Sequence, residues 1–317
     1  MENISIIIPI APGKGTPKVL ESIKNIDYPK NKIEVLLTIG KNPSKQRNEA
    51  VKIAKGRYIF FFDDDVIFKP NHIKKALMNY TNDEIVLVGG PDKYNPEDKF
   101  LRRCFGIVME SYFATQKTRA RFCPVGEKRF GTEKDLIMCN MSVRKSIFDL
   151  EKLDEDLYPC EETDLVNRII ERGYKTIYNP NLITMRSRRQ NIRKFIKQFF
   201  VYGKARIKYA FVAMKKGYKT KNSLFLVPLV FVLYLGSLIF YHPVWYLIPA
   251  LIYISTAILS SLLIIFQKRE LKTILVTPFL FLLIHVSYGI GMLYGSLRII
   301  FPEEMKNQEI IIKRIKC

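Results

Sequence analysis

The sequence predicts an α/β domain with a mostly parallel sheet and helices on both faces, followed by helices associated with a membrane. Over the first 90 residues, short continuous apolar runs alternate with segments of helical spacing. This alternation is typical of strands that are buried on both faces of a parallel sheet. From Leu224 to Phe301 the chain is mostly apolar, whereas the part before about residue 222 has the mixed composition of a soluble domain. That part is long enough for one domain with its own core.

Each element of the domain has its own signal. Strands are expected at the apolar runs, residues 4–10, 33–39, 57–62 and 84–90. Helices are expected between them, at residues 16–26, 44–56 and 70–80. Gly56 stands where a helix C-cap is expected. His72, in the third helix, is expected to be exposed.

Residues 91–160 are less regular, and order returns at "CEETDLVNRIIERGYKTIYNP" (160–180). A helix is expected here because Leu165 and Ile169 share one face and Gly173 stands at the end. Its first turn is acidic, which the helix dipole favours. The residues "KTIYNP" then predict another strand.

The second half of the chain has the features of a membrane region. Residues 191–222 mix aromatic and apolar residues with Lys and Arg, which favours a helix in the membrane interface. Each of the apolar runs that follow has about the 18 residues needed to cross a bilayer, at 224–241, 244–266 and 274–297. We therefore expect a catalytic domain (1–190), an interfacial segment (191–222), a transmembrane region (223–301) and a C-terminal tail (302–317).

Basic residues predict the orientation of these spans. Lysines precede the first span, Lys268 and Lys272 lie between the second and third, and the turn between the first two has no Lys or Arg. The positive-inside rule then places the N-terminal domain and the 267–273 loop in the cytoplasm of a multi-pass cell-membrane protein. The basic tail conflicts with three full crossings, which would leave Lys313 outside. Either the rule fails for the tail, or the third segment does not cross fully.

Charge and composition exclude several classes of function. The net charge of +21 is compatible with nucleic acid, anionic lipid or phosphorylated substrates. Basic residues cluster between Arg186 and Lys221, just before the apolar region, which favours membrane lipids over nucleic acid as the partner. Five scattered cysteines without a CxxC pair indicate reduced thiols, and the chain start does not resemble a signal peptide. With three histidines in the chain, a zinc site or a Ser–His–Asp triad is not expected.

The stretch "FFFDDDVIF" (60–68) carries the clearest chemical signal. Asp63, Asp64 and Asp65 follow a predicted buried strand, at the edge where parallel sheets bind ligands. Adjacent carboxylates repel unless a positive charge compensates them, and clustered carboxylates suit Mg²⁺ or Mn²⁺. The alternative is that these acids cap a turn or the following helix. A second acidic cluster, which begins at Glu161 and includes Asp164, favours the metal.

Taken in order, the motifs resemble a family 2 glycosyltransferase with the GT-A fold. They are "SIIIPI", "NPSKQRNEAVKIAKGRYIFFFDDDV", "VGGPDKYNP", "LDEDLYPCEETDLVNRIIERGYKTIYNP" and "RSRRQNIRKFIKQFFVYGKAR", followed by the apolar hairpin. The resemblance covers nearly the whole chain. It is nearest to membrane-bound transferases of the succinoglycan type and to others that act on exopolysaccharides or lipid-linked glycans.

The resemblance implies roles on the donor side of the site. Asp63 and Asp65 match the family's DxD pair. Asp65 would bind the metal at the donor diphosphate, and Asp63 would hold the nucleoside side, directly or through the metal, while Asp64 would fill the space between. The remaining matches would line the base pocket or face the nucleotide, and they are Pro9, Ala11, Arg47 and Asn48. A relative's aspartate at the end of the second strand is replaced here by "LLTIGKN", which leaves the nucleotide unassigned.

The resemblance also implies roles on the acceptor side. Glu161 and Glu162 match the family's acidic pair, with Glu162 at the position of the catalytic base and the choice between the two open. Arg186 and Gln190 match a region that binds diphosphate or acceptor, with Asp164 nearby. A basic face on lipid headgroups is the alternative explanation for this region.

The resemblance implies that a sugar is transferred from a nucleotide-diphosphate sugar to a hydroxyl of a lipid-linked or polysaccharide acceptor. The transfer would be a single displacement that inverts the anomeric configuration, with a carboxylate as the base and a divalent cation as the cofactor. Two alternatives remain. One is another metal-dependent membrane enzyme on phosphates, such as a nucleotidyltransferase. The other is a non-catalytic membrane scaffold with a degenerate transferase domain.

Overall fold

The structure is a computed structural model that describes residues 1–217, 223–241, 243–268, 270–300 and 309–315. The chain forms two compact units. The catalytic unit comprises Met1–Asn95, Lys117–Ser187 and Met305–Cys317, and the helical unit comprises Pro96–Gln116 and Arg188–Glu304. The bounds of these units differ from the domain bounds expected from the sequence. Residues 96–116 belong with the later helices, and the C-terminal tail belongs with the sheet.

The catalytic unit is built on an eight-stranded sheet in the order β11-β2-β1-β3-β8-β5-β9-β7. Strands β1, β2 and β3 are parallel, as are β5 and β9, whereas β8 runs antiparallel to both of its neighbours. The strand bounds are β1 (Ile4–Ile10), β2 (Ile33–Ile39), β3 (Tyr58–Phe61), β5 (Ile85–Gly89), β7 (Arg129–Phe130), β8 (Met141–Arg144), β9 (Lys175–Tyr178) and β11 (Ile311–Ile315). A small second sheet contains β4 (Ile67–Phe68), β10 (Thr184–Arg186) and β6 (Asp92–Tyr94). The predicted mostly parallel sheet is confirmed.

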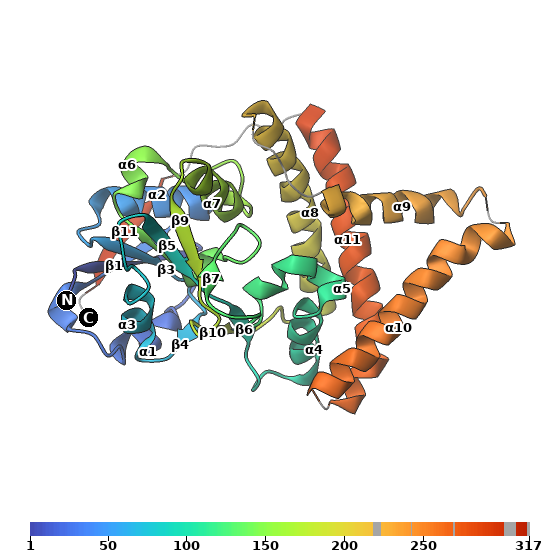
Figure 1. Cartoon of the computed structure of the whole chain (residues 1–317), viewed down its shortest axis with the longest axis horizontal. Helices are drawn as coiled ribbons and strands as arrows, with labels where there is room; N and C mark the ends of the chain where they lie inside the picture. The colour runs from blue at the N-terminus through green and yellow to red at the C-terminus, as the bar shows by residue number, and fades with distance from the viewer. Residues whose placement is uncertain (218–222, 242, 269, 301–308, 316–317) are drawn as a thin grey trace. The chain divides into compact units, whose positions relative to one another are not determined.

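Helices complete the catalytic unit (Figure 1). They are α1 (Val19–Lys24), α2 (Pro43–Ile53), α3 (His72–Leu77), α6 (Ile147–Leu150) and α7 (Glu161–Glu171), with short 3-10 turns η1 (Lys30–Lys32), η2 (Gln116–Arg121) and η3 (Met138–Asn140). Each helix and strand expected before residue 90, and the helix and strand expected after residue 160, is present within a few residues of its predicted bounds. Gly173 follows α7 with a φ of +87°, the left-handed conformation that glycine adopts readily.

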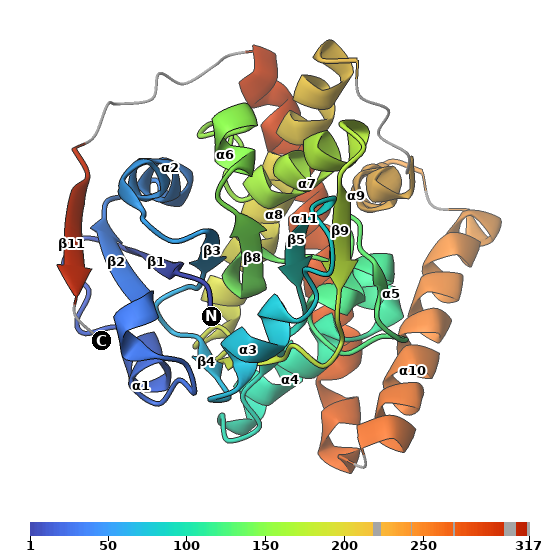
Figure 2. The same cartoon turned by 60° about the vertical axis from the view of Figure 1, so that its left-hand side comes forward.

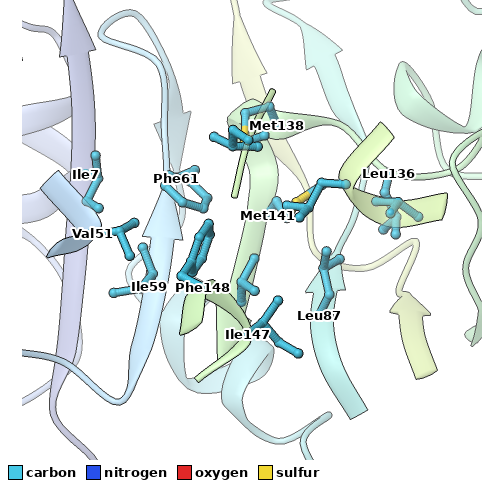
Figure 3. Packing of buried hydrophobic residues seen from close by; sticks show 14 of the residues in the cluster. Ile7, Val51, Ile59, Phe61, Leu87, Leu136, Met138, Met141, Ile147 and Phe148 are labelled. Carbon is cyan, nitrogen blue, oxygen red and sulfur yellow. The ribbon is translucent and has the colours of Figure 1, made fainter. Parts of the chain in front are cut away.

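One large apolar cluster fills the space between the sheet and α2, α6 and α7 (Figure 3). Ile59 and Phe61 of β3 face it, and the rings of Phe61 and Phe148 meet edge to face with centroids 5.9 Å apart. Because side chains alternate along a strand, Phe60 and Phe62 point to the opposite face. The "FFF" run is therefore buried on both sides, which fixes the strand that ends at the aspartates.

Two expectations were wrong in detail. Gly56 is not a C-cap, since α2 ends at Ile53. A Cβ at Gly56 would lie 2.3 Å from the Ser5 nitrogen, so the residue is glycine because the chain passes directly against β1. His72 is buried, not exposed, because it packs against Phe62 and Phe68 on the second face of the sheet.

Strand β11 was not anticipated. It pairs antiparallel with β2 from Ile311 opposite Ile39 to Ile315 opposite Val35. Figure 2 shows it along the outer edge of β2. The tail that the sequence left as a separate segment therefore extends the catalytic sheet and covers an edge that would otherwise expose unpaired backbone groups.

The helical unit contains a long helix, α8 (Ile192–Lys215), that lies beside α11 (Thr277–Ile300) in Figure 1. The other members are α4 (Phe100–Met109), α5 (Tyr112–Thr115), η4 (Ser223–Leu226), α9 (Val227–Ser237), η5 (Val244–Leu247), α10 (Ile248–Lys268) and η6 (Leu271–Leu275). By length and composition, Val244–Lys268 and Thr277–Ile300 are candidates to cross a membrane. The first expected span holds the end of η4 and the helix α9, which has 11 residues.

We predict that the acid stability of the protein depends on His72. Burial lowers the pKa of His72 to about 4, despite a hydrogen bond with Asn140. As the pH falls from about 6.5 to 4, the unfolded chain binds a proton that the folded chain excludes, so the free energy of unfolding decreases by up to about 3 kcal/mol. His72→Gln stays neutral and should flatten this slope in urea unfolding of the detergent-solubilised protein. An unchanged slope would contradict the assignment.

Candidate active site

The carboxyl ends of three parallel strands form one edge of the catalytic sheet. Pro9 and Ala11 lie at and just after the end of β1, the half-buried Pro9 opposite Thr38 of β2. The three aspartates follow β3, whose Phe61 is in register with Ile7 of β1. The structure thus brings the expected base-pocket residues and the expected DxD pair to the same edge, where open α/β sheets bind ligands.

Asp63 is held by two arginines from different elements. One carboxylate oxygen accepts a hydrogen bond from Arg47 Nη2 of α2 at 3.0 Å, and the other accepts from Arg186 Nη1 of β10 at 2.8 Å. Arg186 also pairs through Nε with the buried Asp92 of β6 at 2.7 Å. The positive charge that compensates Asp63 in this structure is therefore provided by guanidinium groups.

Arg47 links this edge to the acidic helix α7. Its Nη1 donates to Glu161 Oε1 at 2.9 Å, and the two side chains are only 3% and 2% exposed. Arg47 can sit there because α2 begins at an Asn42 cap, which accepts from Ser44 N and Lys45 N and orients the helix. Burial and the neighbouring Glu162 raise the pKa of Glu161 well above its usual range, although Arg47 opposes this shift.

Glu162 is held by a different arginine, Arg121 of η2. Arg121 Nη1 donates to Glu162 Oε1 at 2.9 Å, and Nη2 donates to Thr163 Oγ1 at 3.0 Å and to the Glu133 carbonyl. The two glutamates therefore face different arginines. Glu161 is connected to the donor-side aspartate through Arg47, whereas Glu162 belongs to a separate pair.

The other two aspartates of the run have different surroundings. Lys14, on the loop after β1, forms an ion pair with Asp64. Asp65 has no direct ion pair or hydrogen bond with another side chain in the described part of the chain. Burial raises the pKa of Asp65, Arg186 opposes this, and the nearby acidic groups Asp63, Asp64 and Asp92 add to it. Asp65 is thus the carboxylate of the run that most lacks a positive neighbour.

The residues present fit a divalent cation only in part. Among the described residues, no group of three or more His, Cys, Asp or Glu side chains could hold a metal by itself. Asp65 is suited to ligate one because its charge is poorly compensated, while both oxygens of Asp63 are occupied by arginines. Mg²⁺ commonly uses one or two carboxylates and completes its shell with substrate phosphates and water. A cation here would share that pattern.

Three expected site residues have hydrogen-bond or ion-pair partners of their own. The buried Asn48 binds the loop before α7, by donating to the Leu153 carbonyl and to Glu155. Asp164 pairs with Arg168 one turn along α7. Gln190 lies in the helical unit, where it accepts from Lys194.

Sequence reasoning missed Arg121, Asp92 and Lys14. Asp92 lies in "VGGPDKYNP", a motif that contributed to the resemblance, so the sequence could have indicated it as a site residue. Arg121 lies in the irregular region 91–160, where no periodicity indicates which side chains face the site. Its role follows only from the fold, which places η2 beside the start of α7.

We predict that Arg47 is a structural requirement of the site. Arg47→Met would leave Asp63 and the buried Glu161 without their shared cation, and should lower the free energy of unfolding by about 3–5 kcal/mol. The matched control is Arg57→Met, because Arg57 forms an exposed ion pair with Glu2 and should contribute at most about 1 kcal/mol. Equal losses for the two variants in urea titrations would contradict this role.

Comparisons with known proteins identify similar sequences. Residues 7–149 match the family model described as glycosyl transferase family 2. The curated dolichyl N-acetyl-alpha-D-glucosaminyl phosphate 3-beta-D-2,3-diacetamido-2,3-dideoxy-beta-D-glucuronosyltransferase of Methanococcus voltae is 25% identical over 338 residues, which cover 93% of this chain and 99% of that protein.

A solved structure is similar over most of the chain. The mannosyltransferase PcManGT from Pyrobaculum calidifontis, in complex with GDP-Man and Mn²⁺, covers 96% of this chain and 88% of its own at a TM-score of 0.57 and 14% identity. This similarity confirms the GT-A fold. The family match over residues 7–149 and the named glycosyltransferase relative show that the protein is a transferase enzyme, with an N-terminal domain similar to glycosyl transferase family 2.

Proposed function

We propose that the protein transfers a sugar, with inversion, from a nucleotide-diphosphate sugar to a hydroxyl of a lipid-linked or polysaccharide acceptor. The observation that carries the proposal is the chain of charged groups Arg186–Asp63–Arg47–Glu161, which joins the sheet edge to the first turn of α7 beside Glu162. At one end of this series, the Arg186 guanidinium suits a diphosphate. At the other end, Glu161 is next in sequence to the carboxylate of Glu162. The acceptor class is supported by the name of the Methanococcus voltae relative, which specifies a dolichyl-linked sugar phosphate.

On the donor side, Pro9 and Ala11 would contact the base at the end of β1. Arg186 is the cation best placed to meet the diphosphate, because it is half-buried and already bridges Asp63 and Asp92. Asp65 would hold Mg²⁺ or Mn²⁺, with Asp63 beside it if Arg186 turns to the phosphates. A bound cation would neutralise charge that develops on the leaving diphosphate. The Mn²⁺ in the Pyrobaculum calidifontis structure supports a divalent ion.

On the acceptor side, Glu162 would accept the proton of the attacking hydroxyl. A bond forms between the acceptor oxygen and the anomeric carbon while the bond from that carbon to the diphosphate oxygen breaks, which inverts the configuration in one step. Arg121 orients Glu162 through the 2.9 Å contact. Glu161 is a positioning residue in this proposal, because its carboxylate is fixed by Arg47 and its pKa is raised.

The helical unit would keep the enzyme at a cell membrane, where a lipid-linked acceptor resides. Helix α8 carries Lys and Arg along its length among aromatic side chains, which suits contact with lipid headgroups. Helices α9 and α10 expose large apolar side chains along their lengths, as lipid-facing helices do. With positive residues flanking the apolar region, the catalytic unit would be cytoplasmic.

A donor screen tests the activity. Membranes that contain the protein are incubated with a panel of nucleotide sugars and Mg²⁺ or Mn²⁺, and release of nucleoside diphosphate is measured with and without lipid extract. We expect release from at least one donor, a dependence on divalent cation that EDTA abolishes, and stimulation by acceptor lipid. Pyrophosphate release from a nucleoside triphosphate instead would indicate a nucleotidyltransferase, and release from no donor would contradict the proposal.

The side-chain roles make a second prediction. Glu162→Gln removes the base and should lower turnover by roughly 10²–10⁴-fold with the fold intact. Asp65→Ala should lower it by a similar order and raise the cation concentration needed for half-maximal rate. The matched controls are Glu171→Gln, exposed on the same helix, and Asp83→Ala, at an aspartate that is 95% exposed, and both should keep full activity. Full activity of Glu162→Gln would exclude it as the base.

A further inference from the structure

The C-terminal strand fixes where the end of the described chain lies relative to a membrane. Ile311–Ile315 pairs with β2 along its whole length, Arg314 forms a 2.8 Å ion pair with Glu34, and Ile312 packs against the main apolar cluster. The strand is thus a member of the catalytic sheet (Figure 2). A strand cannot be separated from its own sheet by a bilayer, so the tail lies on the same side as the catalytic unit.

Helix α4 fixes the side of a second segment. Residues 96–99 connect the catalytic unit to α4, and fully extended they span at most about 15 Å, half the hydrocarbon thickness of a bilayer. The start of α4 is therefore on the catalytic side. Two ion pairs join α4 and its C-cap to the end of α10 and the start of η6, Arg103–Glu270 at 3.4 Å and Glu110–Lys268 at 2.5 Å. The 268–272 region must then be on the catalytic side as well.

These two placements decide whether α11 crosses. Among the described residues between Glu270 and Ile311, it is the one α-helix, preceded by the short turn η6, and both Glu270 and Ile311 are on the catalytic side. A single helix that crossed would place its two ends on opposite sides. Residues 301–310, "FPEEMKNQEI", cannot provide the return, because they are too short and too charged for a transmembrane helix. Although its length and composition would permit crossing, α11 does not cross.

Within the helical unit, α11 packs along α8. A Cβ at Gly203 of α8 would lie 2.0 Å from the Tyr288 carbonyl oxygen, and one at Gly291 of α11 would lie 2.1 Å from that of Phe200. Such close backbone contact requires glycine on both helices, which are side by side in Figure 1. Helix α8 carries too many Lys and Arg to span a bilayer, so a helix packed along it shares its interfacial position.

The hairpin of α9 and α10 has the properties of the inserted part. From residue 223 to residue 267 the sequence has no Lys, Arg, Asp or Glu. Helix α10, with 21 residues, is about 31 Å long, enough for the hydrocarbon layer. Helix α9 is shorter, but residues 223–241, which include η4 and α9, are uncharged and reach the length of about 18 residues that a crossing needs. The rings of Tyr241, Trp245 and Tyr246 cluster at the turn, with centroids 5.1–5.8 Å apart. Aromatic groups of this kind sit at the membrane–water interface.

We propose that the α9–α10 hairpin alone enters the bilayer, that its aromatic turn reaches the far interface, and that α11 stays beside α8 on the catalytic side. The chain then crosses twice, and the conflict between the basic tail and the positive-inside rule disappears. The proposal rests on the proposed membrane association but not on the proposed sugar transfer.

Cysteine labelling of the full chain tests this topology. In a background of Cys123→Ser and Cys317→Ser, single cysteines are introduced in sealed membrane vesicles of known orientation and exposed to a membrane-impermeant maleimide before and after detergent. Val244→Cys reports the turn, where Val244 is 85% exposed, and Leu271→Cys reports the η6 region, where Leu271 is 73% exposed. Lys313→Cys reports β11, and Lys18→Cys is the reference for the catalytic unit. Both lysines are exposed.

With the catalytic unit inside the vesicles, we expect Val244→Cys to be labelled without detergent. Leu271→Cys, Lys313→Cys and Lys18→Cys should be labelled only after detergent. Labelling of Leu271→Cys or Lys313→Cys in sealed vesicles would overturn the placement of α11, and protection of Val244→Cys would overturn that of the turn. Release of the chain by an alkaline carbonate wash would contradict membrane insertion itself. The labelling needs no sugar donor, so a failed transfer assay leaves this test intact.

Discussion

The buried guanidinium of Arg47 is the contact on which the geometry of the site depends. Three segments that are distant in the sequence, α2, the end of β3 and the first turn of α7, place charged groups within hydrogen-bond distance of one another only because Arg47 lies between two carboxylates. Without a cation there, Asp63 and Glu161 would oppose the packing of α7 on the sheet. The same contact that lets the acidic helix pack also sets the spacing between the proposed donor edge and the proposed base.

The elements of the sheet were predictable because their patterns are local. The apolar runs at 4–10 and 33–39 became β1 and β2 with the same bounds, and the "FFF" run became the central strand that positions the aspartates. The partners of those aspartates were not predictable. Arg186 and Arg47 are both basic residues in regions with many, and nothing in their local sequence shows that they converge on Asp63. A divalent cation was the expected compensating charge for the aspartates. In the structure, two arginines compensate Asp63, and Asp65 is the carboxylate without a directly bound cationic side chain among the residues that the structure describes.

The helical region shows the limit of reading hydropathy alone. Helices α10 and α11 have similar length and composition, yet 17% of the apolar window of one and 44% of the other is buried within the protein. The difference lies in the glycines of α11, which let it approach the backbones of α8 and α9 closely, and in the ion pairs around Glu270. Hydropathy indicates whether the composition of a helix is compatible with the hydrocarbon layer. Small residues and flanking charges determine which neighbour it packs against.

Strand β11 has a consequence for the order of assembly during synthesis. The edge strand β2 is made early, but its partner β11 is made after all the described helices of the second unit, so the sheet stays open at that edge until residues 311–315 have left the ribosome. An open edge invites pairing with other chains. Closure of this edge therefore comes late in synthesis, and a chain that stalls before residue 311 leaves the outer backbone groups of β2 unpaired.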